Sequence, residues 1–388
     1  MKIICVELEN LRHFQDSKFK VDFFATDKVF EDNYLYKISN SVYSQTIIGF
    51  IGLNATGKTT ALRLLKIALK IIIYNADLNS FETATNLLKD GTIIRTTFFH
   101  NEKFYRLESV IGCQNESAYG KEQKFFYKEE ILVSKSKSEI HSRKELTNFQ
   151  GEKLLRSELS KNVKDYLPDS QSFVNPIIKG NNCFVGDNLI FNYINMMSAF
   201  GNTPTPIIEL FDENIEQLSM AADHSTNSIE WNLKFKQDNT IYHADNPISL
   251  NLLISTGTIR GQGLILRAID ALKSGGYLIT DELELHLNKE IVKVILNLFK
   301  DPRTNPNGAC LIFSTHYAEI FDFSILDRKD NIYITRKSDG LLAVSKFSNE
   351  FKRNDFKKSE VFFSNALTGT APKNDTIQRL RDFVCKSL

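Results

Sequence analysis

The sequence predicts an α/β protein in which buried strands, loops and helices follow one another near both ends of the chain. Near the start, the apolar segment "TIIGFIG" (46–52) is typical of a central buried strand, and the apolar run at 61–74 has the length of a helix. Near the end, "GYLITDE" and "ACLIFSTH" are two more short apolar strands, and "GLILRAIDALKS" before them is typical of a helix. Because β and helical material separates these units, we expect one α/β domain that carries an insertion.

The segments between these units are expected to be β-rich at first and helical afterwards. Alternating residues at 2–23 and 92–147 predict strands, the second set as an antiparallel section with polar hairpin tips. From 151 the pattern turns helical, and 205–218 is the clearest helix, capped by Thr205 with Pro206 in its first turn. Its expected apolar stripe consists of Ile207, Ile208, Phe211, Ile215 and Leu218.

After this helix, "NSIEWNLKFK" returns to strand, and the tail "DTIQRLRDFVCKSL" is expected to be a closing helix. Its stripe of Ile377, Leu380 and Phe383 is expected to pack on its own domain rather than on a partner. The chain therefore divides into 1–150, a mostly helical insertion at 151–240, and 241–388.

Composition narrows the class of protein. Apolar residues make up 42% of the 388 residues, so a sizeable core can form, and 48 Lys plus Arg against 47 Asp plus Glu argues against a wholesale polyanion binder. The 5 cysteines are scattered, with no CxxC pair, which indicates a reduced, cytoplasmic protein. The opening "MKIICVELEN" does not resemble a signal peptide. The run at 61–74 is too short to cross a membrane, and its three cations share one face, so we expect a buried helix with one wet edge.

The segment "GLNATGKT" (52–59) matches the G-x-x-x-x-G-K-[ST] pattern of a phosphate loop. It lies between a predicted buried strand and a predicted helix, the context that separates this motif from an ordinary glycine turn. Gly52 and Gly57 allow the backbone to curl so that successive N–H groups, including those of Ala55 and Thr56, point inward. The pattern therefore predicts a site for the phosphates of a nucleotide.

The side chains of this loop have separate expected roles. Lys58 should reach the β- and γ-phosphates, Thr59 should ligate Mg²⁺, and Thr60 should touch the α-phosphate. Asn54 at the crown of the loop either contacts a γ-phosphate or a partner subunit, or is a turn residue that tolerates a left-handed conformation.

Two later strands end in residues suited to hydrolysis of ATP, which needs a carboxylate for the metal and a group that orients water. Asp281, after the strand 277–280, would hold the shell of the Mg²⁺ ion, and Glu282 would polarise the attacking water. His316 ends the strand of "ACLIFSTH" and would sense the γ-phosphate. Acidic residues or a histidine at the end of a strand are common structural features when they occur alone. Their occurrence together with a phosphate loop favours an ATP-hydrolysing site.

Together these elements resemble the ABC-type ATPase head, a P-loop NTPase fold with a mixed central sheet. In this resemblance "ISTGTIRGQG" (254–263) takes the place of the LSxG signature loop, with Ser255 and Gly257 as its serine and glycine. In such heads this loop contacts the γ-phosphate held by a second head, so the resemblance implies a homodimer that encloses two ATP molecules with Mg²⁺. The N-terminus of a helix that begins with small residues offers backbone N–H groups and hydroxyls that can bind an anion.

The stretch "DELELHLN" looks like the DEPExHLHP segment of the OLD-like and RecF-like ATPases, with Leu283 in place of the proline and Asn288 where "HP" would begin. By this likeness Glu284 and His286 lie in a loop that crosses the dimer interface, and Arg12 in "LENLRHF" lies near the nucleotide. The glutamine loop of these heads has no clear counterpart, since Gln114 and Gln123 fall in the β section.

The chain carries no Toprim nuclease constellation after His316 and no long coiled-coil insertion. The resemblance therefore implies a stand-alone head of the kind found in bacterial anti-phage operons, which controls a separately encoded toxin or nuclease. Two alternatives stay open: a RecF-like repair ATPase that binds DNA through the basic clusters 135–144 and 351–358, and a scaffold that binds ATP with little turnover. Each cluster can equally be a solvated surface.

Overall fold

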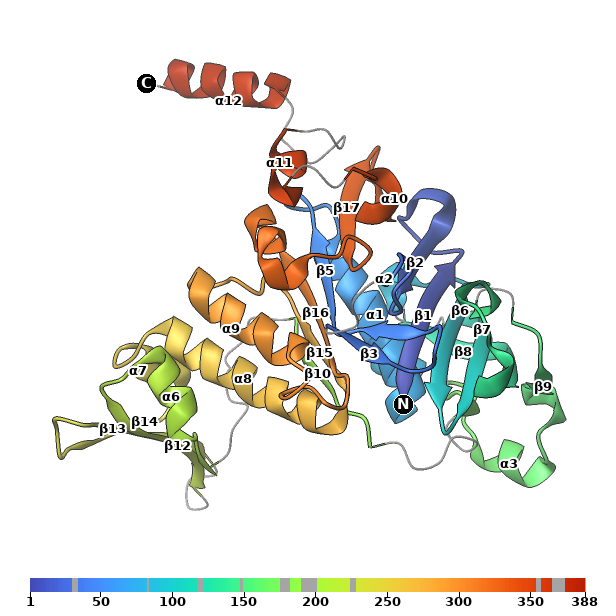
Figure 1. Cartoon of the computed structure of the whole chain (residues 1–388), viewed down its shortest axis with the longest axis horizontal. Coiled ribbons are helices and arrows are strands. Elements are labelled where there is room, and N and C mark those ends of the chain that lie inside the picture. The colour runs from blue at the N-terminus through green and yellow to red at the C-terminus, as the bar shows by residue number, and fades with distance from the viewer. Residues whose placement is uncertain are drawn as a thin grey trace.

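The computed structural model describes residues 1–29, 34–81, 84–116, 122–146, 149–174, 182–189, 201–223, 228–353, 357–364 and 374–387. Two six-stranded sheets and a smaller four-stranded sheet form its framework (Figure 1). The mixed α/β class expected from the sequence is confirmed.

The central sheet brings together strands that are far apart in the chain. Its strand order is β10-β15-β16-β5-β17-β18, and all neighbours are parallel except β17 and β18. The bounds are β5 Ile47–Ile51, β10 Val185–Asn188, β15 Tyr277–Thr280, β16 Cys310–Thr315, β17 Ile332–Ser338 and β18 Leu341–Lys346. Every residue of β5, β15 and β16 is buried, as their apolar sequences predict. Because these three strands are parallel, their carboxyl ends lie at one edge of the sheet.

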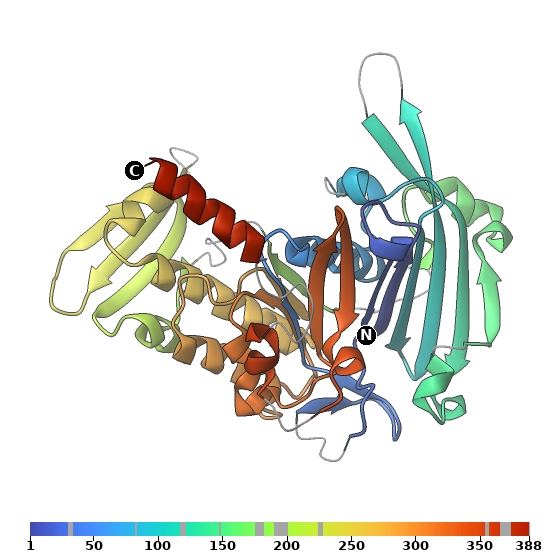
Figure 2. The ribbon, with the colours of Figure 1, turned by 90° about the horizontal axis from the view of Figure 1, so that it is seen from above.

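Helix α1 (Lys58–Tyr74) lies between the central sheet and the second large sheet (Figure 2). Eleven of its residues are buried, so it is apolar around most of its circumference. At its one polar edge, Lys66 and Lys70 pair with Asp187 of β10 at 2.9 and 3.2 Å. The expected buried helix with one wet edge is confirmed.

The second large sheet is antiparallel, in the order β2-β1-β6-β7-β8-β9. Its bounds are β1 Lys2–Glu9, β2 Lys18–Asp22, β6 Ile93–His100, β7 Lys103–Glu116, β8 Glu122–Ser136 and β9 Glu152–Leu155. The antiparallel β section expected at 92–147 is therefore present, and the strands from the start of the chain extend it.

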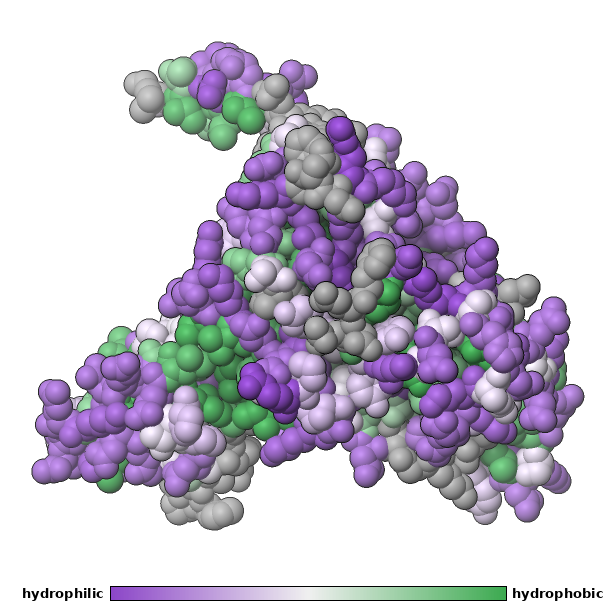
Figure 3. Space-filling model, in the orientation of Figure 1, coloured by the Kyte–Doolittle hydropathy of each residue, from purple (hydrophilic) through white to green (hydrophobic). Residues whose placement is uncertain are grey.

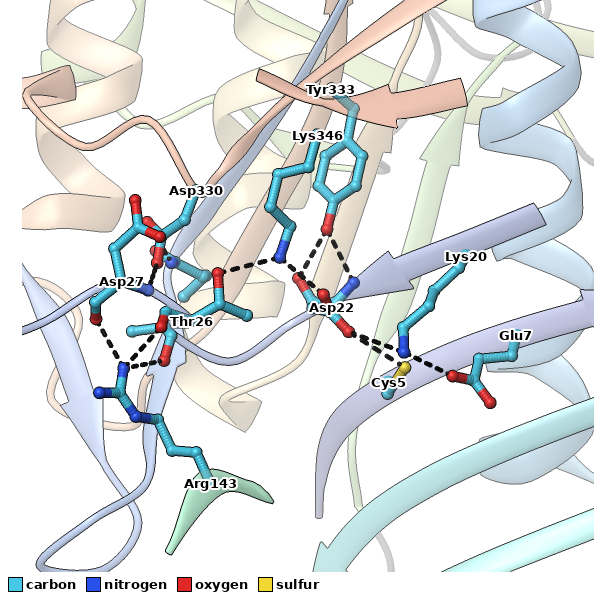
Figure 4. Close-up of polar contacts among 12 residues, drawn as sticks. Cys5, Glu7, Lys20, Asp22, Thr26, Asp27, Arg143, Asp330, Tyr333 and Lys346 are labelled. Carbon is cyan, nitrogen blue, oxygen red and sulfur yellow. Dashed lines mark hydrogen bonds and ion pairs between the residues drawn. The ribbon is translucent and has the colours of Figure 1, made fainter. Parts of the chain in front are cut away.

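Polar contacts join the end of β2 to the central sheet (Figure 4). Lys346 of β18, whose side chain is buried, donates to Asp22 at 2.6 Å and to Thr26 at 3.1 Å. The backbone N–H of Asp22 donates to the Tyr333 hydroxyl of β17 at 2.8 Å, and the N–H of Asp27 donates to Asp330 at 2.8 Å. These bonds pair Lys346, Asp22 and Asp330 across the boundary, and they fix how the two sheets meet.

The third sheet shows that the prediction of a mostly helical insertion at 151–240 is wrong. Helix α6 covers only Thr205–Phe211, and strands β11 (Gly201–Asn202), β12 (Ile215–Asp223), β13 (Ser228–Phe235) and β14 (Ile241–Ala244) pair antiparallel. Ile215 and Leu218, predicted to extend the helical stripe, belong to β12. Asp212 ends the helix, because its carboxylate accepts from the N–H of Asn214 at 2.9 Å in a local turn. The described part of this segment contains more strand than helix.

A separate small core holds this third sheet together. It comprises Ile208, Ile215, Leu218, Met220, Trp231, Leu233, Ala244, Leu250, Ile254 and Ile259. Helices α7 (Pro247–Asn251) and α8 (Thr256–Ser274) follow β14, and the start of α8 joins this core to the central sheet (Figure 1). The other described elements are β3 Leu35–Lys37, β4 Tyr43–Gln45, α2 Ala84–Leu87, α3 Lys161–Tyr166, α9 Lys289–Lys300, α10 Phe347–Glu350, α11 Lys358–Phe363 and α12 Asn374–Ser387.

Helix α12 stands away from the rest of the described chain, and its apolar side is visible in Figure 3. The expectation that the tail packs on its own domain is wrong, because Ile377, Leu380 and Phe383 are 39%, 62% and 68% exposed. The segment "TIQRLRDFVCK" contains no Gly or Pro, and its Gln, Arg, Leu and Lys residues favour a helix. Among the described helices, none is long and apolar enough to cross a membrane.

Candidate nucleotide site

The candidate site lies where β5, β15 and β16 end. A cavity of about 410 Å³ opens over the phosphate loop, between β5 and α1. Its lining consists of His13, Asn54, Ala55, Gly57, Lys58, Thr59, Thr60, Asn86, Leu87, Glu282, His316, Lys337, Gly340 and Leu342. The structure therefore brings most of the predicted phosphate-loop residues, Glu282 and His316 around one space of suitable size for a ligand.

The backbone of the phosphate loop has the curled form that its sequence predicts. Ala55 and Gly57 have positive φ angles of 60° and 93°, and Gly57 packs against Leu342 of β18. Gly52 lies against β17, where a Cβ atom would come 2.3 Å from the Thr335 hydroxyl oxygen. Gly52 and Thr56 do not line the cavity: the Thr56 hydroxyl bonds to that of Thr335 at 2.8 Å and fixes the base of the loop.

Lys58 spans the mouth of the loop. Its ammonium donates to the carbonyls of Gly52 and Leu53 at 2.8 and 3.0 Å, and lies 3.3 Å from His316 Nδ1. Burial lowers the pKa of Lys58, whereas the carboxylates of Asp281 and Glu282 oppose that change. A buried cation held by two backbone carbonyls and an imidazole nitrogen is well placed to exchange a carbonyl for a phosphate oxygen.

Thr59 and Asp281 form a pair of oxygen donors. The Thr59 hydroxyl donates to Asp281 Oδ2 at 2.5 Å, and the hydroxyl of Ser314 on β16 donates to Oδ1. Hydroxyl and carboxylate oxygens are the hard donors that Mg²⁺ prefers, usually with phosphate oxygens and water completing the shell. The two residues predicted to ligate or support Mg²⁺ therefore fit that ion by chemistry and by proximity. Ser314 was not predicted, although it stands two residues before His316 in "FSTH".

Glu282 and His316 face each other across the edge of the cavity. His316 Nε2 lies 3.1 Å from Glu282 Oε1, while Nδ1 faces the Lys58 ammonium. Because the ammonium can only donate, this network assigns the histidine proton to Nε2, which donates to Glu282. The backbone of Glu282 has a φ of +47°, which is uncommon for a side-chain-bearing residue and is typical of functional sites.

Ser255 and Gly257 do not join this cavity. Ser255 is exposed and caps α8, with its hydroxyl accepting from the N–H of Thr258 at 3.0 Å. The helix begins at Thr256, not near Gly263 as the glycines suggest, because the Ser255 cap stabilises its first turn. These residues are therefore at a helix N-terminus, separate from the phosphate loop of the same chain.

Other predicted positions have different environments. The guanidinium of Arg12 donates to the Leu88 carbonyl at 2.9 Å, and its neighbour His13 lines the cavity. Gln114 and Gln123 lie on β7 and β8 and do not line it. The sequence did not predict four further residues of the cavity lining: His13, Lys337, Gly340 and Leu342. The first lies in the 10–17 loop and the other three in the β17–β18 hairpin. The Leu342 N–H donates to the His13 carbonyl at 2.7 Å and joins the two segments.

The chain was compared with solved structures, with curated proteins and with protein families. One solved structure, "Dimeric structure of a post-hydrolysis state of the ATP-binding cassette MJ0796 bound to ADP and Pi", shares 12% identity, with 88% of this chain and 98% of that chain covered and a TM-score of 0.29. This similarity is too weak to support a conclusion about the chain. No curated protein matches. Residues 47–322, more than half of the chain, match the family described as "AAA domain, putative AbiEii toxin, Type IV TA system", and this span includes the phosphate loop, Asp281, Glu282 and His316. The chain therefore belongs to this family of P-loop AAA domains.

Proposed function

We propose that this protein binds Mg-ATP and hydrolyses it, and that two copies do so face to face around two ATP molecules. The observation that carries the proposal is the convergence of Lys58, Asp281, Glu282 and His316 at the carboxyl edge of the central sheet. Phosphoryl transfer depends mainly on positioning and on charge stabilisation, and these four side chains supply both.

Each residue has a role that follows from its contacts. Lys58 replaces a loop carbonyl with the β- and γ-phosphate oxygens. Thr59 and Asp281 would hold Mg²⁺, which neutralises charge on the phosphates when bound. Glu282 accepts a proton from the attacking water, and His316 orients that carboxylate from its Nε2 side. The histidine thereby links the carboxylate to the lysine that holds the phosphate.

The dimer is proposed because Ser255 and Gly257 lie outside the cavity of their own chain. They are at an exposed helix N-terminus, where N–H groups and hydroxyls suit an anion supplied by a second copy. The exposed Ile248 and Leu252, at 61% and 84%, lie just before this helix and supply apolar surface for such contact. In this arrangement each site is completed by its partner.

We further propose that the ATPase controls a separately encoded effector, a toxin or nuclease, in the cytoplasm, and that it acts in anti-phage defence. The family description names a putative toxin of a type IV TA system, and membership of such a system supports a partner protein. DNA binding receives less support, because Lys137 pairs with Glu102 at 3.0 Å and Arg143 donates to the backbone carbonyls of Ala25, Thr26 and Asp27. Lys137 and Arg143 of cluster 135–144 thus have contacts within the chain.

ATP hydrolysis by the purified protein, measured against protein concentration, tests this proposal. We expect turnover that needs Mg²⁺, a rate per subunit that rises with concentration, and no response to duplex DNA. A rate per subunit independent of concentration would contradict the dimer, and a strong stimulation by DNA would favour a repair ATPase. Absence of turnover with intact ATP binding would leave the scaffold function instead. Co-purification with products of neighbouring reading frames tests the effector.

A further inference from the structure

Arg260 occupies an unusual position in the first turns of α8. It is 3% exposed, and its guanidinium donates to three backbone carbonyls of the segment that follows β15. These acceptors are Asp281 at 3.0 Å, Glu282 at 2.8 Å and Leu285. Burial lowers the pKa of Arg260 to about 10, while neighbouring carboxylates, Glu284 first, counteract that change.

The segment that Arg260 holds is the one that carries Glu282. Between β15 and α9, Glu282 and His286 have positive φ angles of 47° and 61°, so this turn departs twice from ordinary backbone conformations. Such a turn persists only where its surroundings fix it. The hydroxyl of Ser314 fixes one side by accepting from the Glu282 N–H at 2.8 Å. Arg260 fixes the other side through the carbonyls.

A second contact ties the same helix to the same turn. A Cβ atom on Gly257 would lie 2.5 Å from the His286 carbonyl oxygen, so only glycine allows the first turn of α8 to approach so closely. Helix α8 begins at Ser255, the residue proposed to meet the nucleotide of the partner. Gly257 and Arg260 therefore connect this helix end rigidly to the turn that positions Glu282.

We propose that Arg260 is a positioning residue for hydrolysis, which sets the Glu282 backbone and couples it to the helix end at Ser255. The inference rests on the proposed ATPase function. Its physical basis is the guanidinium fork, since a planar group with several N–H donors can hold three carbonyls in fixed directions. An ammonium at this position keeps the charge but not that geometry. Contact of Ser255 with a partner's nucleotide would thus reach Glu282 through one buried side chain.

The test compares Arg260→Lys with a matched control in the same full chain. Arg267, two turns further along α8, is also partly buried and donates to a backbone carbonyl, that of Asp187 on β10 rather than one of the 281–286 turn. Arg267→Lys therefore makes the same chemical change in the same helix away from the turn. For each variant we would measure kcat, the Kd for ATP, and hydrogen exchange of a peptide covering 281–288.

The amides of this peptide report the turn directly, because those of Leu283, Leu285 and Leu287 donate within it or to β16. We expect Arg260→Lys to lower kcat by about 100-fold with the Kd for ATP nearly unchanged, as for a misplaced catalytic group. Exchange at 281–288 should become faster, while Arg267→Lys changes neither quantity. Gly257→Ala, which pushes on the same turn, should act in the same direction and serves if Arg260→Lys folds poorly.

Equal exchange and equal kcat in the Arg260 and Arg267 variants would overturn the inference. A fall in kcat caused only by weaker ATP binding would also overturn it, since positioning of Glu282 predicts an effect on turnover. If the wild-type protein shows no turnover, the proposed ATPase function fails. The exchange comparison then still tests whether Arg260 fixes the Glu282 turn: faster exchange confined to the Arg260 variant supports this, and equal exchange refutes it.

Discussion

Replacement of Glu282 by Gln should nearly abolish hydrolysis without disturbing the site. In the structure, Glu282 accepts one hydrogen bond from His316 Nε2 at 3.1 Å, and a glutamine Oε1 can accept the same bond at the same length. The substitution therefore preserves volume and contact but removes the proton acceptor for water. A general base contributes about 10²- to 10⁴-fold, or about 3–5 kcal/mol of barrier.

The assay is steady-state release of phosphate at saturating Mg-ATP, with size-exclusion chromatography and light scattering in parallel. Because the variant binds ATP and does not consume it, we expect the ATP-bound species to have twice the 44.4 kDa mass of one chain. Glu290→Gln on α9 is the matched control, since Glu290 is exposed and its carboxylate pairs with Lys293 of the same helix at 2.6 Å. It should behave as the wild type.

Wild-type turnover by Glu282→Gln would refute the role of Glu282 as base and would direct attention to another residue of the cavity. Loss of turnover without an ATP-bound dimer would leave the base in place but refute the face-to-face arrangement. The catalytic role of Glu282 and the face-to-face dimer are therefore tested separately.

Three further changes test the phosphate loop and two ion pairs elsewhere in the fold. Gly52→Ala should weaken ATP binding at least about tenfold, because the added Cβ would lie 2.3 Å from the Thr335 hydroxyl oxygen and must displace the loop; titration with Mg-ATP measures this, and unchanged affinity would contradict it. Arg156→Met should cost about 3–5 kcal/mol in urea unfolding, because it leaves the fully buried Glu130 without its cation at 2.6 Å; a loss below about 1 kcal/mol would show that the remaining donors suffice. Asp187 has its pKa held below 3.8 because two lysines of α1 outweigh the opposing effect of burial, so the carboxylate contributes stability that is present above its unfolded pKa and lost as pH falls through the folded one. Asp187→Asn should therefore be less stable than wild type at pH 7 and approach it below about pH 4, and an equal difference at both pH values would argue against this ion pair.

The sequence predicts those site residues that come directly after a recognisable strand. In "GLNATGKT", "LITDE" and "FSTH", a buried strand ends and polar residues begin, so both the element and the functional side chain can be located without long-range information. Parallel pairing of β5, β15 and β16 then places them at one edge. The approach of Thr59 to Asp281 and of His316 to Glu282 agrees with that placement.

The wrong prediction of a helix over 205–218 also has a local cause. The stripe through Ile215 and Leu218 continues a helical period past Phe211, but the sequence "DEN" that interrupts it favours a turn. In strand β12, Leu218 and Met220 are two residues apart and are both buried on one face, as the alternation of a strand requires. Over so few residues, this alternation is difficult to distinguish from a helical pattern. The contacts of Arg260 could not be inferred, because its acceptors are backbone carbonyls of a distant turn and carry no sequence signal.

The burial of α1 between two sheets has a consequence for how the chain can be divided. The phosphate loop is continuous with a helix whose surroundings come from β1 and β6 on one side and from β10, β15 and β16 on the other. Strand β5 likewise lies between β16 and β17, which both come after residue 309. A fragment ending near residue 150 would expose the apolar surface of both elements to water. Nucleotide binding should therefore be gained or lost with folding of the whole core as one cooperative unit, and split versions of the gene should regain it only when both fragments are present together.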